Sequence, residues 1–355
     1  MRLLRTAVAV SSLLALSLTA ACSTSTEPAD PEETTAVETT AAETTAAETT
    51  PAESEGEPTA GGDIPMGDGT QTIYLVSKGF QHRFWQAVNE GAQQAGEEFG
   101  YKVEFVGPEN ETQVTQQLDQ LTTALNSNPA AIGFAALDSG AASPVLDKIQ
   151  AADIPIIAFD SGVESDIPLT TVQTDNIAAA AEAAKNMAEL VDNTGTVGLV
   201  CHDQTSTTGI ERCEGFQDWM KENAPEINLL EPQYAGEVGL AANTAKAMVQ
   251  ANPDMVGIYG TNEASAIGAL QGVQESGKEL TIVGFDSGKA QLDAIRSGVQ
   301  AGAITQSPVK MGYETVKAAI MAINDQELPK IIDSGFAWYD AENMEDEDIT
   351  SNLYE

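Results

Sequence analysis

The stretch TIYLVSKGFQHRFWQAVNEGAQQAG, from Thr72 to Gly96, joins a short apolar run to a longer helical pattern. Its first six residues, rich in β-branched and aromatic side chains, are typical of a buried β-strand. In the second part, Val88 and Ala92 follow Phe84 at the four-residue spacing of one helix face. A strand followed directly by an amphipathic helix predicts the first half of a βαβ unit.

The same unit recurs along the chain. The strand candidates are TIYLVS (72–77), KVEFVG (102–107), AIGFAAL (131–137), PIIAFD (155–160), TVGLVC (196–201), NLLEPQY (228–234), MVGIYG (255–260), TIVGFD (281–286) and AGAITQ (301–306). The helix candidates between them include 84–99, 114–125, 178–191, 241–250 and 264–275. This alternation predicts parallel sheets, and the continuous apolar character of the strands indicates that helices cover both faces.

The number of units exceeds what one hydrophobic core usually serves. Four strand candidates precede the polar stretch TTVQTDN (170–176) and five follow it. We therefore expect an α/β fold with two doubly wound parallel-sheet lobes and a central cleft. In open α/β sheets, ligands bind beyond the carboxyl ends of the strands, which directs attention to the residues that follow each strand.

The first residues predict export. Arg2 and Arg5 precede an apolar run too short to span a bilayer, and we interpret residues 1–21 as a signal peptide. Leu18 to Cys22 (LTAAC) resembles a bacterial lipobox, with Thr19 where a leucine is usual. Lipidation of Cys22 would anchor the protein to the outer face of the cell membrane. The alternative is an ordinary cleaved signal in which Cys22 has no special role.

Residues 22–68 form an acidic run rich in Thr, Ala and Glu, with a near-exact ETTAA repeat. Such a sequence cannot bury enough apolar surface to offset its chain entropy, so we expect a disordered tether. Its composition leaves open whether it is a plain spacer or is O-glycosylated.

The formal net charge of -38 disfavours binding to nucleic acid or to an anionic membrane surface, since both would be repelled. Any contact with the membrane is therefore expected only through the lipid anchor. Cys201 and Cys213 remain as an even pair in an exported protein. They are expected to form a disulfide, with two buried free thiols as the alternative.

Polar side chains follow most of the predicted strands. They are Ser77-Lys78, Asp138-Ser139, Asp160-Ser161, His202-Asp203, Asn262-Glu263, Asp286-Ser287 and Gln306. Capping of the next helix would account for Ser139, Ser161 and Ser287. It accounts poorly for Gln306 and does not explain the repeated aspartates, of which Asp138, Asp160 and Asp286 are candidate ligand contacts.

Fixed carboxylates and amides suit the hydroxyl groups of a neutral polyhydroxylated ligand, and aromatic faces suit the apolar side of its ring. Phe84 and Trp85 could supply those faces at the start of the first helix. Their alternative role is core packing against Val88 and Ala92.

An enzyme is disfavoured. His202, Asp203 and Ser206 lie too close together on one loop to form a catalytic triad, and no nucleophile elbow is present. His202 and Asp203 fit the rim of a pocket or a plain loop. With His82 and His202 as the only histidines, we expect no catalytic metal site and no cofactor.

The order and spacing of several motifs resemble the sugar-type substrate-binding proteins of ABC importers, the ribose and galactose class. The motifs are SKGFQHRFWQAVNEGAQQAG, NPAAIGFAALDS, IPIIAFDS, QTDN, GIERCEGF, NPDMVGIYGTNEASAIGAL, TIVGFDSGKAQLDAIRSG and ITQSPVKMG. The resemblance covers the body of the protein, essentially residues 70–340. The resemblance implies the periplasmic binding protein type I fold, with three crossovers near 172–176, 305–308 and 332–336. It also implies an N-terminal lobe of residues 69–173 and 307–333 and a C-terminal lobe of residues 174–306 and 334–355.

The resemblance implies ligand contacts at His82, Phe84, Trp85, Asp160, Arg212, Asn262, Asp286 and Gln306. An arginine of the family pattern is replaced here by Ser161. A family aromatic residue near the sixth strand is also missing, since Ala235 and Gly236 stand there, although Tyr234 could compensate.

The expected partners are a small ligand, a sugar in the first place, and an ABC transporter permease, with the protein itself a monomer. A polyol, a nucleoside or a furanose-like signal molecule is the alternative ligand. A repressor of the lactose type shares the fold but needs a DNA-binding helix-turn-helix, where this chain has an export signal and an acidic tether.

Overall fold

The computed structural model describes residues 64–80 and 82–354. The expected signal peptide, the lipidation site Cys22 and the tether up to Asp63 lie outside the described residues. Within the described part, no helix has the length and apolar character needed to cross a membrane.

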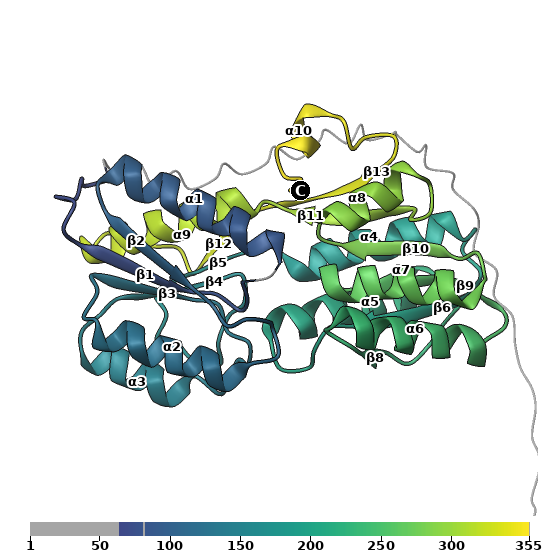
Figure 1. Cartoon of the computed structure of the whole chain (residues 1–355), viewed down its shortest axis with the longest axis horizontal. Coiled ribbons are helices and arrows are strands. Elements are labelled where there is room, and N and C mark those ends of the chain that lie inside the picture. Colours follow the sequence, from purple (N-terminus) through teal and green to yellow (C-terminus); the bar gives the residue numbers. More distant parts are fainter. Residues whose placement is uncertain (1–63, 81, 355) are drawn as a thin grey trace, which may run out of the picture. The chain divides into compact units, whose positions relative to one another are not determined.

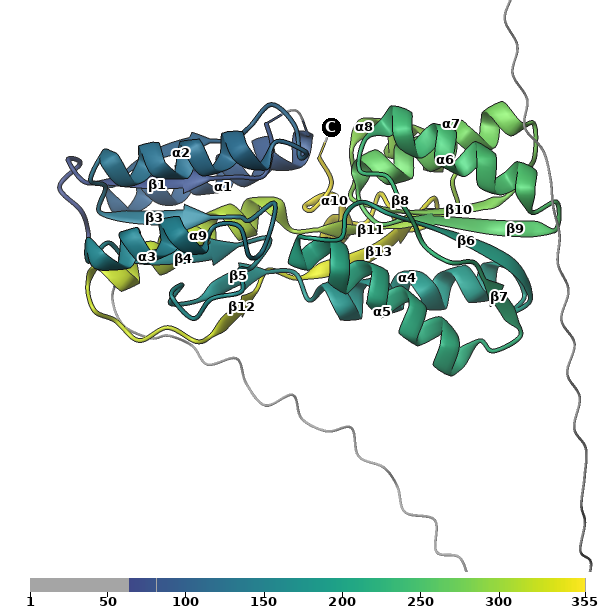
Figure 2. The same cartoon turned by 90° about the horizontal axis from the view of Figure 1, so that it is seen from below.

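The N-terminal lobe is built on a parallel sheet with the strand order β12-β5-β4-β3-β1-β2. The strands are β1 (Thr72–Val76), β2 (Lys102–Val106), β3 (Ala131–Phe134), β4 (Ile156–Phe159), β5 (Thr171–Gln173) and β12 (Ile331–Asp333). One face is covered by α1 (Arg83–Phe99) and α9 (Pro308–Ile323), and the other by α2 (Val114–Asn126) and α3 (Ser143–Ala151) (Figures 1 and 2). All residues of β3 and β4 are buried, as expected for strands covered on both faces.

The C-terminal lobe repeats this arrangement around the order β13-β11-β10-β9-β6-β7, with β8 pairing with β6. The strands are β6 (Gly195–Cys201), β7 (Ile227–Leu229), β8 (Gln233–Tyr234), β9 (Met255–Gly260), β10 (Thr281–Phe285), β11 (Gly302–Gln306) and β13 (Phe336–Asp340). The helices are α4 (Asn176–Leu190), α5 (Thr207–Asn223), α6 (Val238–Ala251), α7 (Glu263–Ser276), α8 (Lys289–Arg296) and α10 (Glu347–Thr350). Helices α4 and α5 pack on one face, and α6 and α7 pack on the other (Figure 2).

The structure departs from the sequence-based expectation in three respects. NLLEPQY, expected as one strand, forms two short strands, β7 and β8, interrupted at Pro232, whose nitrogen has no hydrogen to donate to a ladder. The short strands β5 and β12 were not recognised as separate strands. Strand β13 pairs with β11 in the antiparallel direction, so the second sheet is not purely parallel.

Helix α1 is held closely against α9 by two glycines. A Cβ atom on Gly91 would lie 1.8 Å from the carbonyl oxygen of Val309, and one on Gly312 would lie 1.9 Å from that of Val88. Any side chain at either position would force the helices apart. This close packing fixes the axis of α1, which carries Phe84 and Trp85 in its first turn.

The three chain crossovers between the lobes meet in one hydrogen-bonded cluster. The hydroxyl of Thr174 donates to Oε1 of Gln306 at 2.9 Å and lies 3.3 Å from the hydroxyl of Ser334. Each of these three buried residues belongs to a different crossover. The cluster therefore links the segments that must bend together if the lobes move.

Candidate ligand-binding cleft

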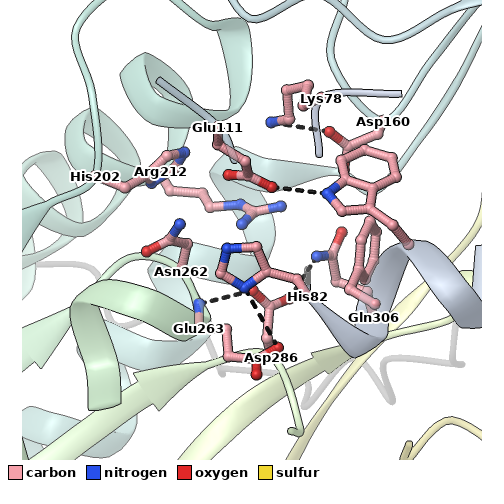
Figure 3. A pocket seen from close by; sticks show the side chains of 12 residues that line it. Lys78, His82, Glu111, Asp160, His202, Arg212, Asn262, Glu263, Asp286 and Gln306 are labelled. Atoms are coloured by element: carbon pink, nitrogen blue, oxygen red, sulfur yellow. Dashed lines mark hydrogen bonds and ion pairs between the residues drawn. The ribbon is translucent and has the colours of Figure 1, made fainter. Parts of the chain in front are cut away.

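A small cavity lies where the carboxyl ends of the strands of the two sheets meet (Figure 3). Its volume is about 20 Å³, room for about one water molecule. The lining residues are Lys78, His82, Phe84, Trp85, Glu111, Asp160, His202, Arg212, Asn262, Glu263, Asp286 and Gln306. A sugar ring is larger, so its entry requires the lobes to separate or the side chains to turn.

Asp160 and Asp286 hold equivalent positions in the two lobes. Each directly follows a central strand, β4 or β10, and each has a left-handed backbone, with φ of 56° and 76°. Asp tolerates this conformation better than most residues, although it costs free energy. The backbone N–H of Asp160 donates to Val172 and that of Asp286 to Ile304, which ties both turns to the neighbouring strand.

Each oxygen of the Asp286 carboxylate accepts one hydrogen bond, which leaves further acceptor capacity. Its Oδ1 accepts from Nε2 of Gln306 at 2.7 Å, and its Oδ2 accepts from the backbone N–H of Glu263 at 2.9 Å. Because Gln306 also accepts from Thr174, the cleft is connected to the crossovers by a chain of two hydrogen bonds.

Lys78 and Asp160 form a buried ion pair, with Nζ and Oδ2 2.9 Å apart and both side chains no more than 5% exposed. Burial lowers the pKa of Lys78, but the charges of Asp160, Glu111 and Asp203 together outweigh this effect and hold the pKa above its usual value. Burial raises the pKa of Asp160, and Lys78 offsets part of the rise. Lys78 also donates to the hydroxyl of Thr208 at 2.8 Å, so its charge connects the two lobes.

Arg212 enters the cleft from α5. Its Nε donates to Oδ1 of Asn176 at 2.8 Å, and Nη1 donates to the carbonyl oxygen of Thr261 at 3.3 Å. The guanidinium carbon lies 3.8 Å from the ring centroid of Phe285, a cation–π contact. These three contacts fix the plane of the guanidinium, which is only 3% exposed.

Phe84 and Trp85 pack in the core, as one of the two sequence interpretations expects, and they also line the cavity. Both line the cavity and both belong to the hydrophobic core of the N-terminal lobe, with exposures of 5% and 1%. Their ring centroids lie 4.9 Å apart in an edge-to-face arrangement. The indole N–H of Trp85 donates to Oε1 of Glu111 at 2.8 Å, which brings an acid from the loop after β2 into the cleft (Figure 3).

Two further acids of the cleft have shifted pKa values. Burial and the nearby charge of Asp286 raise the pKa of Glu263 to about 7, against an opposing effect of His82, whose Nδ1 lies 3.9 Å from Oε2 of Glu263. Burial raises the pKa of Glu111, but the charges of His82 and Lys78 outweigh it and leave the pKa below its usual value. Near neutral pH the cleft thus holds one ionised glutamate and one that is partly protonated.

His202 is neutral at neutral pH, since burial lowers its pKa to about 4 against the charge of Asp203. Its Nδ1 lies 2.7 Å from the hydroxyl of Thr261, and its Nε2 lies 3.4 Å from that of Thr208. It lines the cavity and also supports the loop before α5, which combines the two roles weighed from the sequence.

The cavity brings together all the sequence-predicted contacts except one. His82, Phe84, Trp85, Asp160, Arg212, Asn262, Asp286 and Gln306 line it. Asp138 does not: its Oδ1 accepts from the backbone N–H groups of Gly140 and Ala141 and so closes a turn. Asn262 caps α7 through its Oδ1 and Ser265, so it serves as a cap while it lines the cavity.

The expected capping role of three serines is wrong. The next helices along the chain, α3, α4 and α8, begin after Ala142, Asp175 and Gly288 instead. Ser139 contacts Glu164, Ser161 contacts Thr207, and Ser287 contacts Asn352. The loops after these strands are longer than the capping interpretation assumed.

Sequence reasoning missed one lining residue entirely. Glu111 lies in the loop 107–113 after β2, and the only signal for it was its position beyond a strand end. Lys78, His202 and Glu263 stood among the polar residues after the strands but were not chosen as ligand contacts.

The lobes also contact each other through the start of α5 and the loop that precedes it. The hydroxyl of Thr207 accepts from the backbone N–H of Gly162 at 2.8 Å and lies 3.0 Å from the hydroxyl of Ser161. Thr205 donates its hydroxyl to the carbonyl oxygen of Leu137. We call these contacts the α5 latch, because they join the loops after β3 and β4 to the opposite lobe.

The structure joins Cys201, at the end of β6, to Cys213 in α5 by a disulfide, with their Cα atoms 5.8 Å apart. The bond tethers the helix that carries Arg212 to the sheet. In the part of the chain that the structure covers, no group of three or more His, Cys, Asp or Glu side chains could hold a metal ion.

The model of the periplasmic binding protein domain matches residues 73–327, most of the chain. The chain belongs to the periplasmic binding protein family. It is 28% identical over 264 residues to the ribose import binding protein of Haemophilus influenzae, which covers 72% of this chain and 87% of the relative.

Solved structures of the family agree with the fold. A solute-binding protein of an Agrobacterium vitis ABC transporter, bound to α-D-tagatopyranose, superposes with a TM-score of 0.77 at 28% identity, covering 80% of this chain and 99% of that one. A protein from Brachyspira murdochii, described as an ABC transporter and LacI family transcriptional regulator, is 35% identical with a TM-score of 0.70, covering 80% and 99%. Proteins of this family bind solutes for transporters, and the periplasmic binding proteins among them lie outside the cytoplasm.

Proposed function

We propose that the protein captures a neutral monosaccharide between its lobes and delivers it to the permease of an ABC importer, without making or breaking a bond. The observation that carries this proposal is the cleft itself. Buried carboxylates, an amide and a guanidinium face an aromatic pair at the meeting point of two sheets, the combination that a ring with several hydroxyl groups requires. The ligands of the ribose and tagatose binders support the same class.

The charges of the cleft favour a neutral ligand over an anionic one. Glu111, Asp160 and Asp286, together with the partly protonated Glu263, outnumber the two cations, Lys78 and Arg212. Lys78 is already paired with Asp160, so it offers little attraction to a phosphate or carboxylate. Sugar phosphates and sugar acids would meet net repulsion in a buried site.

The setting of this activity is also proposed. The export signal and Cys22 support a monomeric lipoprotein held at the outer face of the cell membrane, with residues 22–68 as its tether. A polyol or nucleoside remains the alternative ligand, since both present hydroxyl groups to the same acceptors.

Isothermal titration of the full chain with D-ribose, D-tagatose, D-arabinose, xylitol, adenosine and ribose 5-phosphate tests the proposal. We expect binding of one of the neutral sugars and none of the phosphate. Asp286→Asn should weaken that binding by about 10- to 100-fold, because hydrogen bonds to a charged group contribute about 1.5–3 kcal/mol. Asn also tolerates the left-handed backbone, so the change removes charge without adding strain.

Asp293→Asn is the matched control, since Asp293 is an exposed aspartate on α8 and its loss should leave affinity unchanged. Binding of xylitol or adenosine alone would replace the sugar by the alternative ligand. Tight binding of ribose 5-phosphate, or equal affinity in wild type and Asp286→Asn, would contradict the proposed site.

A further inference from the structure

The segment after β13 is anchored on the C-terminal lobe. Met344 is buried with Leu292 and Ile295 of α8, and Ile349 and Leu353 pack against the same cluster. In Figure 1 this yellow segment passes through α10 and turns back toward the start of α1. It therefore moves with the C-terminal lobe until its last described residues.

The segment is tied down beside a crossover. The carbonyl oxygen of Asn352 accepts from the hydroxyl of Thr305 at 2.9 Å and from that of Ser287 at 3.5 Å. Thr305 and Ser287 are adjacent in sequence to the cleft residues Gln306 and Asp286. The residues that follow Asn352 are thus placed next to the cleft.

Tyr354 then crosses to the other lobe. Its side chain is 8% exposed and belongs to the hydrophobic core of the N-terminal lobe. Its ring centroid lies 6.1 Å from that of Phe84, with the rings inclined at 63°. Its hydroxyl accepts from the backbone N–H of Ser287 at 3.3 Å, so one side chain contacts both lobes.

Phe84 depends on such packing for its position. It lies in the first turn of α1, where His82 occupies the N-cap without a side-chain capping bond. Trp85 packs edge-on against its ring, and Tyr354 contacts it without lining the cavity. Phe84 therefore stands between the cavity and Tyr354.

We propose that Tyr354 is a positioning residue that holds Phe84 in the wall of the cleft. In the arrangement that the structure shows, Tyr354 reaches Phe84 from the segment on the C-terminal lobe, so the wall on the N-terminal lobe includes a ring held from the other lobe. A ligand that contacts Phe84 and bridges the lobes favours this arrangement. This inference rests on the proposed function for its effect on ligand affinity, whereas the packing of Phe84 can be measured without a ligand.

Tyr354→Ala, Tyr354→Phe and the control Tyr313→Ala, each in the full chain, test it. Tyr313 is a matched control: its ring lies 6.1 Å from that of Phe99 and packs against the same core, but it does not line the cavity. Hydrogen exchange of the ligand-free protein is followed at the amides of residues 84–88. Titration with the sugar that binds the wild type gives the affinity.

We expect Tyr354→Ala to speed exchange at residues 84–88 by about tenfold or more, because the turn loses the packing that resists local opening. It should also weaken sugar binding by about tenfold or more, as small displacements of a positioned group are costly. Tyr354→Phe, which keeps the ring, should restore both to within about threefold of wild type. Tyr313→Ala should change neither, although it lowers the melting temperature.

Equal effects of Tyr354→Ala and Tyr313→Ala would overturn the inference, as would failure of Tyr354→Phe to restore the exchange rates. If the wild type binds no sugar of the panel, the proposed function fails separately, and the exchange rates alone decide the role of Tyr354.

Discussion

Lys78 contributes a charge to the cleft and also forms a contact between the two lobes. Its ammonium group pairs with Asp160 in its own lobe and donates to Thr208 in the other. A buried ion pair contributes little net stability compared with apolar residues, but removal of one partner leaves an uncompensated buried charge. The consequences of replacing Lys78 can therefore be separated from ligand binding.

Replacement Lys78→Met is expected to lower the free energy of unfolding by about 3–5 kcal/mol, since Asp160 then loses its counter-charge in a buried site. Urea denaturation of the ligand-free protein measures this. Adding Asp160→Asn to the same variant should recover a large part of the loss, because the unpaired charge is gone. The control Lys246→Met breaks an exposed pair with Glu275 and should cost about 1 kcal/mol or less. No recovery in the double variant would show that the ion pair is not the cause.

Among the helices and strands, the sequence predicts those whose pattern of apolar residues is set by burial. Strands β3 and β4 are apolar throughout because helices cover both faces, and this is visible without a structure. Strand β12 escapes notice because it is short and Ile331 is 59% exposed, so its pairing with β5 comes from tertiary context. The two-lobe α/β fold could be predicted, whereas the antiparallel β13 could not.

The residues of the candidate site likewise include some that the sequence predicts and some that it does not. Asp160, Asn262 and Asp286 could be predicted because the ends of parallel strands meet at one edge of each sheet. Glu111 could not, because its place in the cleft depends on the conformation of a loop and on the indole of Trp85. Asp138 is the opposite case, because the sequence predicts it as a ligand contact but it does not line the cavity. It follows a strand like the other aspartates, but its carboxylate accepts a backbone hydrogen bond within the turn that it closes.

The disulfide joins two elements of the C-terminal lobe, β6 and α5, across a separation of 12 residues. The double replacement Cys201→Ala and Cys213→Ala is expected to lower the free energy of unfolding by about 2–4 kcal/mol, since the crosslink restricts the unfolded chain. Loss of buried sulfur atoms also weakens packing, so comparison of each protein with and without a reducing agent isolates the crosslink. The reducing agent should destabilise the wild type and leave the double variant unchanged. Equal urea midpoints of the wild type in both conditions would contradict a stabilising disulfide.

In the whole molecule, the crossover cluster and the α5 latch both affect the opening and closing of the two lobes. Thr174, Gln306 and Ser334 connect the segments that bend, while Thr207 joins the lobes directly to each other. Closure about a few hinge residues is a general mode of ligand capture. A contact made only between closed lobes stabilises the closed complex without helping the ligand to enter an open one.

Thr207→Val, which keeps the shape of the side chain but removes the hydroxyl that Thr207 contributes to the latch, is expected to change the kinetics of ligand release. Loss of two hydrogen bonds, each contributing about 0.5–1.5 kcal/mol, should speed ligand release by about 5- to 100-fold. The association rate should stay within about twofold, because ligand enters before the latch forms. Stopped-flow tryptophan fluorescence with the bound sugar measures both rates.

Thr123→Val serves as the control for Thr207→Val, since the hydroxyl of Thr123 donates to the carbonyl oxygen of Asp119 on the exposed face of its own helix, α2. Faster association with unchanged release would mean that the latch forms before the ligand binds. The lobes would then be held together without a ligand, and the barrier to capture would be their opening. If only release becomes faster, the latch forms after the ligand has bound. The latch then lengthens the time for which the closed complex can bind its permease.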